Sequence, residues 1–291
     1  MIGEGTSLQI YEELEFKSPR LLLSLSGWMD GGEVSTGTVR WLIEKLHAKD
    51  FADIDPQGYY IYNVPGMMEV AALFRPHVTI KNGLIKSVEF PTNAFFYDSV
   101  NDLILFLGKE PNMHWEEFSD AIFSLCEQCH VKEIYFIGSV SSLVPHTREP
   151  RLLCTASKPE LLERFQHYGV KLANYEGPAS IVNHLLDNCS QQNLEMVNLV
   201  ATIPAYVQGS NPKCIEAVTQ RLAGMLDLKI DFKDMRLITE DFERKLDALV
   251  KQQPDLAENI VKLEEDYDNE IFNNEMGELR SWLQQKGIRL D

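Results

Sequence analysis

Basic residues are scarce in this sequence. Its 291 residues include 27 lysines and arginines against 44 aspartates and glutamates, which gives a formal net charge of −17. Binding to nucleic-acid backbones and to anionic membranes depends on Lys and Arg, because these residues displace counterions from phosphates. We therefore expect no nucleic acid and no membrane among the partners of this protein.

Long apolar runs are also missing. No stretch approaches the roughly 18 consecutive apolar residues of a membrane-spanning helix. The first residues, MIGEGTSLQIYEELEF, are acidic, whereas a secretory signal has a basic start and an apolar core. These two absences predict a cytoplasmic protein.

Cysteines are few, and their odd number, five, indicates reduced thiols rather than a disulfide framework. Cys126 and Cys129 form a Cys-x-x-Cys pair, but a structural zinc site needs four ligands and the sequence has no second pair. A redox pair would stand at the start of a helix, whereas this one closes the helical pattern WEEFSDAIFSLCEQC. We predict buried or half-buried thiols, and we expect neither a metal nor a cofactor.

What the sequence does contain is an alternation of apolar strands with amphipathic helices, at the 44% hydrophobic content of an ordinary globular protein. Strand patterns include RLLLSLSG, YYIYNV, DLILFLG, KEIYFIGSV and EMVNLVATIP, and HVTIKNGLIKSVEF predicts a hairpin that turns at Asn82-Gly83. Strands that are apolar throughout need helices on both faces. We predict an α/β fold, a three-layer α/β/α domain with a mostly parallel sheet, over residues 5–231.

The sequence changes character from about Phe232. It becomes rich in Glu and Asp, it has no strand pattern, and its apolar residues fall at helical spacing in two or three segments that Pro254 interrupts. We predict an acidic helical extension over residues 232–291. We interpret its run Glu264-Glu265-Asp266 as a solvated helix face rather than a metal site.

The loops after the strands carry the candidate site, because open parallel sheets bind ligands beyond the carboxyl ends of their strands. In the first loop, Gly27-Trp28-Met29-Asp30-Gly31-Gly32, Asp30 is a good helix N-cap, and Glu33 completes a capping-box pattern. The alternative is that free N–H groups at this helix start bind an anion. The loop lacks the Lys and Ser/Thr partners of a P-loop, so we favour the cap and keep Asp30 as a candidate pocket residue.

A second candidate is the polar stretch SVSSLVPHTREP, which contains His146 and Arg148. A serine beside His146 suits nucleophilic chemistry if the imidazole reaches the hydroxyl and an acid orients it, but no Gly-x-Ser-x-Gly elbow is present. The alternative is a structural loop in which His146 and Arg148 hydrogen-bond carbonyls or carboxylates. Glu176, in YEGPASI, is either a general base, a partner of Arg148, or a carboxylate stabilised by a helix start.

Three of these segments, GWMDGG, PHTREP and YEGPASI, occur in this order in the proteasome assembly chaperone 2 (PAC2) family of archaeal and bacterial proteins, which the chain resembles over about residues 8–230. The resemblance implies a phosphorylase/hydrolase-like fold, self-association into oligomers, and kinship with chaperones that help assemble proteasome α-rings. Some descriptions of the family attach an ATP-grasp label, but we find no glycine-rich phosphate loop and no paired magnesium ligands. Such chaperones can end in a hydrophobic-Tyr-any tripeptide. This chain ends Arg289-Leu290-Asp291, so we do not expect proteasome docking by that route.

Two functional hypotheses follow. The preferred one is an oligomeric PAC2-like protein that binds itself and another protein as an assembly chaperone or scaffold. The alternative is an enzyme or small-molecule sensor with a pocket at the strand ends, in which Arg148 binds a carboxylate or phosphate and His146 or Glu176 moves a proton. Convergence of these residues with Asp30 around an accessible cavity would favour the enzyme, and a closed network would count against it.

Overall fold

The computed structural model describes residues 7–166, 168–192 and 194–285, so the terminal Arg289-Leu290-Asp291 lies outside the described residues. The strands are β1 Leu8–Ile10, β2 Arg20–Ser26, β3 Lys49–Ile54, β4 His77–Lys81, β5 Leu84–Glu89, β6 Ala94–Asp98, β7 Leu103–Lys109, β8 Glu133–Ser142, β9 Leu152–Ala156, β10 Lys171–Leu172 and β11 Glu195–Pro204. The helices are a 3-10 turn at Gly31–Glu33 followed by α1 Val34–Leu46, α2 Met68–Ala72, α3 Trp115–Gln128, α4 Pro159–Gln166, α5 Ile181–Gln192, α6 Pro212–Met225, α7 Lys233–Lys251 and α8 Pro254–Gln285.

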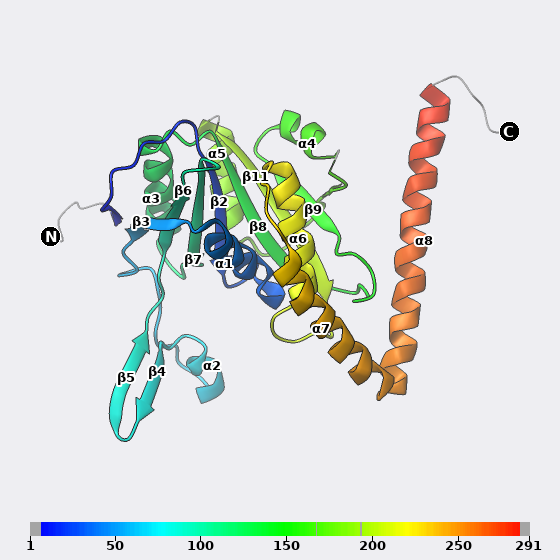
Figure 1. The fold of residues 1–291 in the computed structure, drawn as a ribbon, viewed down its shortest axis with the longest axis horizontal. Helices are drawn as coiled ribbons and strands as arrows, with labels where there is room; N and C mark the ends of the chain where they lie inside the picture. Colours follow the sequence, from blue (N-terminus) through cyan, green and yellow to red (C-terminus); the bar gives the residue numbers. More distant parts are fainter. Residues whose placement is uncertain (1–6, 167, 193, 286–291) are drawn as a thin grey trace.

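A single large sheet organises the domain (Figure 1). In the described part of the chain it has nine strands in the order β1-β3-β6-β7-β2-β8-β11-β9-β10. The central strands β7, β2, β8 and β11 run parallel to one another. On one side β6, β3 and β1 pair antiparallel, and on the other β9 pairs antiparallel with β11. The sheet is therefore parallel at its centre and mixed at its margins.

Helices cover both faces of this sheet, which confirms the predicted α/β/α layering. Successive residues of β2 point to opposite faces: Leu21 and Leu23 enter the core that α3 and α5 cover, while Leu22 enters the core that α1, α4 and α6 cover. All three leucines are buried. An apolar strand that is covered on both faces is what the uniform run RLLLSLS requires.

One predicted strand is wrong. YYIYNV, residues 59–64, forms no strand. The strand beyond β6 is instead β3, which pairs with β6 on one side and with the edge strand β1 on the other. Tyr59 and Tyr60 are buried through their rings, and their hydroxyl groups bond to Ser7 and to Asn93. The apolar run thus reflects the burial of side chains in irregular backbone. Strand β3 begins with the charged, exposed residues Lys49 and Asp50, so its sequence does not have the apolar pattern of a strand.

The predicted hairpin is confirmed and projects from the domain (Figure 1). Asn82 and Gly83 take φ values of 53° and 76°, which suit the tight turn that such a pair favours. Strands β4 and β5 form a two-stranded sheet of their own, next to the short helix α2. We call residues 61–91 the arm.

The C-terminal segment is helical, as predicted, but its last part is one helix of 32 residues rather than two segments. Pro254 begins this helix, α8, at a position where its missing N–H costs nothing. The buried residues Met235 of α7 and Ile260 and Tyr267 of α8 show that both helices pack on other parts of the chain. Among the described residues there is no helix whose length and apolar character would suit a membrane span.

Candidate functional site

The loop after β2 turns the chain sharply into α1, and two of its glycines are required there. Gly27 has a φ of 140°, and a Cβ on it would lie 2.9 Å from the Cβ of Glu110. Gly32 has a φ of 63°, and a Cβ on it would lie 2.9 Å from the Cβ of Asn211. Any side chain at either position would combine an unfavourable backbone conformation with a clash.

Asp30 is the N-cap residue of the 3-10 turn, but its carboxylate caps the first turn of α1 beyond that turn. Its carboxylate accepts hydrogen bonds from the Thr36 backbone N–H at 3.1 Å and from the Thr36 hydroxyl at 2.7 Å. Burial raises the pKa of Asp30, although the bonds from Thr36 oppose that shift. The predicted capping box is wrong, because Glu33 takes a left-handed φ of 53° and makes no side-chain cap. The chain's own carboxylate thus occupies the position that an anion would take at this helix start.

A second carboxylate, Glu110, joins two of the motif segments. One oxygen accepts the backbone N–H of Trp28, at 2.9 Å, and the other accepts that of Ile181, the first residue of α5, at 3.2 Å. Sequence reasoning missed this residue. The signal was its position directly after the buried strand β7, on the edge where ligand-binding loops gather.

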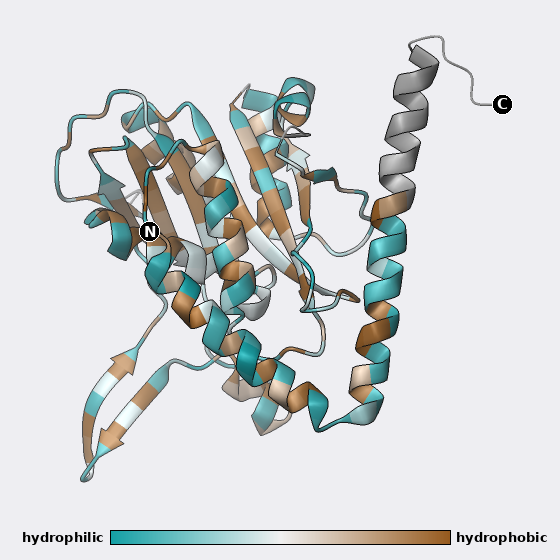
Figure 2. Cartoon of the chain, turned by 45° about the vertical axis from the view of Figure 1, so that its right-hand side comes forward, coloured by the Kyte–Doolittle hydropathy of each residue, from teal (hydrophilic) through white to brown (hydrophobic). Residues whose placement is uncertain are grey.

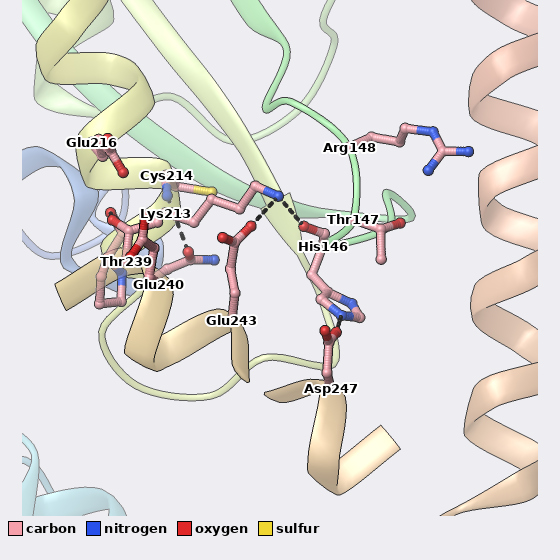
Figure 3. A network of polar contacts seen from close by, with 12 residues as sticks. His146, Thr147, Arg148, Lys213, Cys214, Glu216, Thr239, Glu240, Glu243 and Asp247 are labelled. Atoms are coloured by element: carbon pink, nitrogen blue, oxygen red, sulfur yellow. Dashed lines mark hydrogen bonds and ion pairs between the residues drawn. The ribbon is translucent and has the colours of Figure 1, made fainter. Parts of the chain in front are cut away.

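His146 is buried and held from two sides. The Tyr206 hydroxyl accepts the His146 backbone N–H at 2.7 Å and also hydrogen-bonds its Nδ1 at 2.7 Å. The Nε2 of His146 lies 3.2 Å from the Asp247 carboxylate of α7 (Figure 3). Both ring nitrogens therefore bond to partners other than a serine hydroxyl. The geometry matches the alternative of a structural loop, in which His146 bonds to a carboxylate, rather than a nucleophilic serine site.

Lys213 adds a further link between this loop and α7. Its ammonium group donates to the His146 carbonyl at 2.7 Å and pairs with Glu243 at 2.7 Å. The lysine stands in the first turn of α6, so it joins the loop after β8, the helix α6 and the helix α7 at one point (Figure 3).

Arg148 binds α8. Its guanidinium donates to both carboxylate oxygens of Asp268, at 2.9 Å and 2.7 Å, and lies 3.4 Å from Glu264. Glu264 also accepts a hydrogen bond from the Thr147 hydroxyl. The hydrogen bond from Arg148 lowers the pKa of Asp268, and the Asp268 carboxylate raises the pKa of Arg148.

These contacts correct two interpretations. Glu176 is exposed, and Arg148 pairs with Asp268 and Glu264 in its place. Within the acidic run, Glu265 and Asp266 are exposed as predicted, but Glu264 is half-buried against the loop.

Contacts between the loop and α8 continue beyond Arg148. The hydroxyl of the buried Tyr267 donates to the Glu149 carbonyl at 2.8 Å, and the guanidinium of Arg151 lies 4.1 Å from the centre of the Tyr267 ring. Arg151 and Lys171 both pair with Glu270. The acidic helix therefore lies along a row of three cations supplied by the domain.

Little space remains at this site. The cavity beside His146 and Arg148 has a volume of about 10 Å³, room for one water molecule, whereas small-molecule pockets usually measure about 300–1,000 Å³. Asp30 and Glu176 are not among the residues that line it. Of the four candidate residues, the structure places His146 and Arg148 beside the same small cavity, where each bonds to a different C-terminal helix.

The cysteine prediction is confirmed. Cys126 and Cys129 are buried at the end of α3, and burial raises the pKa of both thiols, for Cys129 to about 11. Within the part of the chain that the structure describes, no group of three His, Cys, Asp or Glu side chains is placed to hold a metal ion.

Fold and site together define a class: an α/β/α protein with a central parallel sheet, whose strand-end loops are closed by its own C-terminal helices. The model of the PAC2 family matches residues 24–250, which is most of the chain. This protein belongs to the PAC2 family. A comparison with curated proteins finds no match.

Solved structures show the same fold. A Mycobacterium tuberculosis protein of unknown function aligns with a TM-score of 0.83 at 23% identity, over 95% of this chain and 94% of its own. A PAC2 family protein from Streptomyces avermitilis aligns with a TM-score of 0.70 at 25% identity, over 83% of this chain and 99% of its own. A second M. tuberculosis protein, described as a proteasome-assembly chaperone homologue, aligns with a TM-score of 0.71 at 24% identity, over 83% and 99%.

Proposed function

We propose that this chain is an assembly chaperone or scaffold, which binds other proteins and copies of itself in the cytoplasm. One contrast carries the proposal. The loop of His146 and Arg148 bonds to α7 and α8, and the cavity beside it measures only about 10 Å³, whereas large apolar side chains stand exposed along the arm. An exposed apolar surface on a projecting arm, together with a strand-end cavity too small for a ligand, suits a protein that binds other proteins.

The relatives support the same proposal. One structural relative is described as a proteasome-assembly chaperone homologue, so an assembly intermediate is the class of partner to test first. Buried free cysteines, Cys126 and Cys189 among them, suit a reducing compartment such as the cytoplasm.

We further propose that residues 5–231 form the binding module and residues 232–291 an acidic helical clamp on it. The described part of this clamp bonds to the module through Asp247, Glu243 and Asp268. Its function is to hold the loop of His146 and Arg148 rigid, because the contacts of His146 with Asp247 and of Arg148 with Asp268 link the loop to helices from a distant part of the chain.

The test is co-purification with quantitative mass spectrometry of the full chain from its native cytosol, with chemical cross-linking to preserve weak complexes. We expect a defined protein in stoichiometric amounts, with cross-links to the arm. A thermal-shift screen of nucleotides with magnesium, nucleosides and small carboxylates is the counter-test, run on the wild type and on Arg148→Ala. A ligand that raises the melting temperature of the wild type but not of the variant, together with recovery of the chain only by itself, would overturn the proposal in favour of the enzyme or sensor.

A further inference from the structure

A larger cavity lies at the opposite end of the central strands from the loop of His146 and Arg148. Its volume is about 500 Å³, within the range of about 300–1,000 Å³ that small-molecule pockets occupy. Most of its wall comes from α3, and the rest comes from Val131, just before β8, and from the end of α5 with Leu194, just before β11. The cavity therefore shares no element with the loop after β8.

The floor of this cavity is apolar. Cys126 and Val131 are buried members of the core that α3 and α5 cover. Phe123 and Leu194 are half-buried and pack against that core. The strands of the sheet carry mostly hydrophobic residues (Figure 2). A ligand with a hydrocarbon body would remove apolar surface from water on both sides of the contact.

Two carboxylates stand at the rim. Asp120 and Glu127 both line the cavity and are exposed, and neither has a side-chain partner in the part of the chain that the structure describes. They lie seven residues apart in α3, which is close to two helical turns, so their side chains share one face. At a rise of about 1.5 Å per residue, they are about 10 Å apart along the helix axis.

No basic residue of the two helices offsets this negative charge. Helix α3 contains four acidic residues and α5 contains one, and neither helix contains a lysine or an arginine. Lys132 adjoins Val131 in the sequence but does not line the cavity, and Lys158 pairs with Glu195. The field at the cavity is therefore negative, and such a field attracts cations.

Two helix dipoles strengthen that field. Helix α3 ends at Gln128 and α5 at Gln192, so the negative ends of both dipoles lie at the cavity. Basic residues are favoured in the last turn of a helix, yet neither helix has one there. In α3 that turn contains Glu127 instead, which the dipole disfavours. A local rule that is broken without compensation inside the chain points to a site where a ligand supplies the compensation.

We propose that this cavity binds a linear aliphatic diamine or polyamine. One ammonium group pairs with Glu127 beside the two helix ends, the other pairs with Asp120, and the hydrocarbon between them covers the apolar floor. A chain of about eight carbons spans the distance of about 10 Å, because each C–C bond of about 1.5 Å advances an extended chain by a little over 1 Å. The site is independent of the proposed function, since it shares no residue with the arm or with the loop after β8.

The first experiment is isothermal titration calorimetry of the full chain with 1,8-diaminooctane, at about 150 mM salt to screen loosely held counterions. We expect a single site, and spermidine, which has a similar length, should occupy it too. Two probes are controls: 1,4-diaminobutane is too short to reach both carboxylates, and 1-aminooctane has the hydrocarbon but only one ammonium group. Each control should bind at least about two- to fivefold more weakly, which is the factor for one exposed ion pair.

The second experiment repeats the titration on three variants, each checked for folding by circular dichroism. Asp120→Asn with Glu127→Gln removes both charges at nearly constant shape, and should weaken the binding of 1,8-diaminooctane about tenfold. Glu116→Gln with Glu117→Gln makes the same charge change in the first turn of α3, outside the cavity, and should leave the affinity within about twofold of the wild type. Ser124→Trp keeps every charge but fills the cavity, so it should abolish binding.

The opposite outcomes overturn the proposal. If 1,4-diaminobutane binds as tightly as 1,8-diaminooctane, or if both charge variants bind equally well, the chain attracts cations only as an acidic protein. Unchanged binding to Ser124→Trp would place the ligand outside the cavity. The last probe is a helical peptide with two lysines seven residues apart. If it binds more tightly than the diamine and loses its affinity in the same variants, the cavity belongs to a basic segment of a partner protein rather than to a small molecule.

Discussion

Truncation of Tyr267 to alanine should release α8 from the domain. Tyr267 is 8% exposed, its hydroxyl donates to the Glu149 carbonyl at 2.8 Å, and its ring stacks under the Arg151 guanidinium at 4.1 Å. Loss of the hydroxyl alone, in Tyr267→Phe, removes one hydrogen bond worth about 1 kcal/mol. Loss of the whole ring from a buried site costs about 3–5 kcal/mol.

The local opening of α8 reports these energies directly. Amide hydrogen exchange of peptides from residues 254–272 measures the opening free energy of the helix where reclosing is fast. At about 1.4 kcal/mol per tenfold, we expect exchange to rise about fivefold in Tyr267→Phe and more than a hundredfold in Tyr267→Ala. Peptides from β2 and β8 should not change, because their leucine and isoleucine side chains lie in the core of the sheet.

Phe272→Ala is the matched control, because this ring stands on the same helix and is 61% exposed. An exposed truncation should change the opening free energy by less than about 0.5 kcal/mol. The reasoning fails if Tyr267→Ala exchanges within a factor of two of the wild type, or if Phe272→Ala has as large an effect as Tyr267→Ala.

Three further results are expected. Asp30→Ala should lower the free energy of unfolding by about 1–2 kcal/mol in urea denaturation, since it removes the cap on Thr36, and Asp30→Asn, which keeps an acceptor, should lose less; equal losses would contradict the cap. The hydrogen bond from Arg148 lowers the pKa of Asp268 below its unfolded value of about 4. The pair therefore stabilises the docked helix above that pH, and its contribution is lost as the pH falls through the lowered folded value. Energy transfer between dyes on α8 and on the domain should show that acid undocks the helix, and that this undocking is weaker in Asp268→Asn. Burial raises the pKa of Cys126 and Cys189, so the native protein should leave all five thiols unreactive towards a disulfide reagent until it unfolds, and rapid labelling of the folded chain would refute that account.

Much of the fold could be predicted from the sequence because its signals are local. An apolar strand such as RLLLSLS needs cover on both faces, and the structure divides Leu21 and Leu22 between two cores. Asn82-Gly83 predicts its own turn, and Asp30 caps the helix that starts four residues later. In the turn and the cap the interacting residues are near neighbours in the chain, and in the strand the need for cover can be read from the strand itself, so a short window contains each signal.

The strands at the margin were harder to predict. YYIYNV has the composition of a strand, yet its tyrosines are buried as side chains in irregular backbone, while KDFADI pairs with β6 despite two charged residues at its start. The position of a strand at the edge of a sheet depends on which neighbour it finds, and propensity alone does not contain that choice.

The sequence by itself determined the layers, the hairpin, the helical C-terminal segment, and the identity of the residues that stand after the strands. Only the tertiary structure decided what those residues do. His146 meets Asp247 across 101 positions and Arg148 meets Asp268 across 120. The first pair depends on where α7 lies, and the second on α8 turning back after Gln252 and Gln253. The sequence of an acidic residue is the same whether its carboxylate faces water or an arginine, so the pairing is set by the path of the chain in space. That path gives His146 and Arg148 partners from the C-terminal helices, where the sequence had offered them as residues of a ligand pocket.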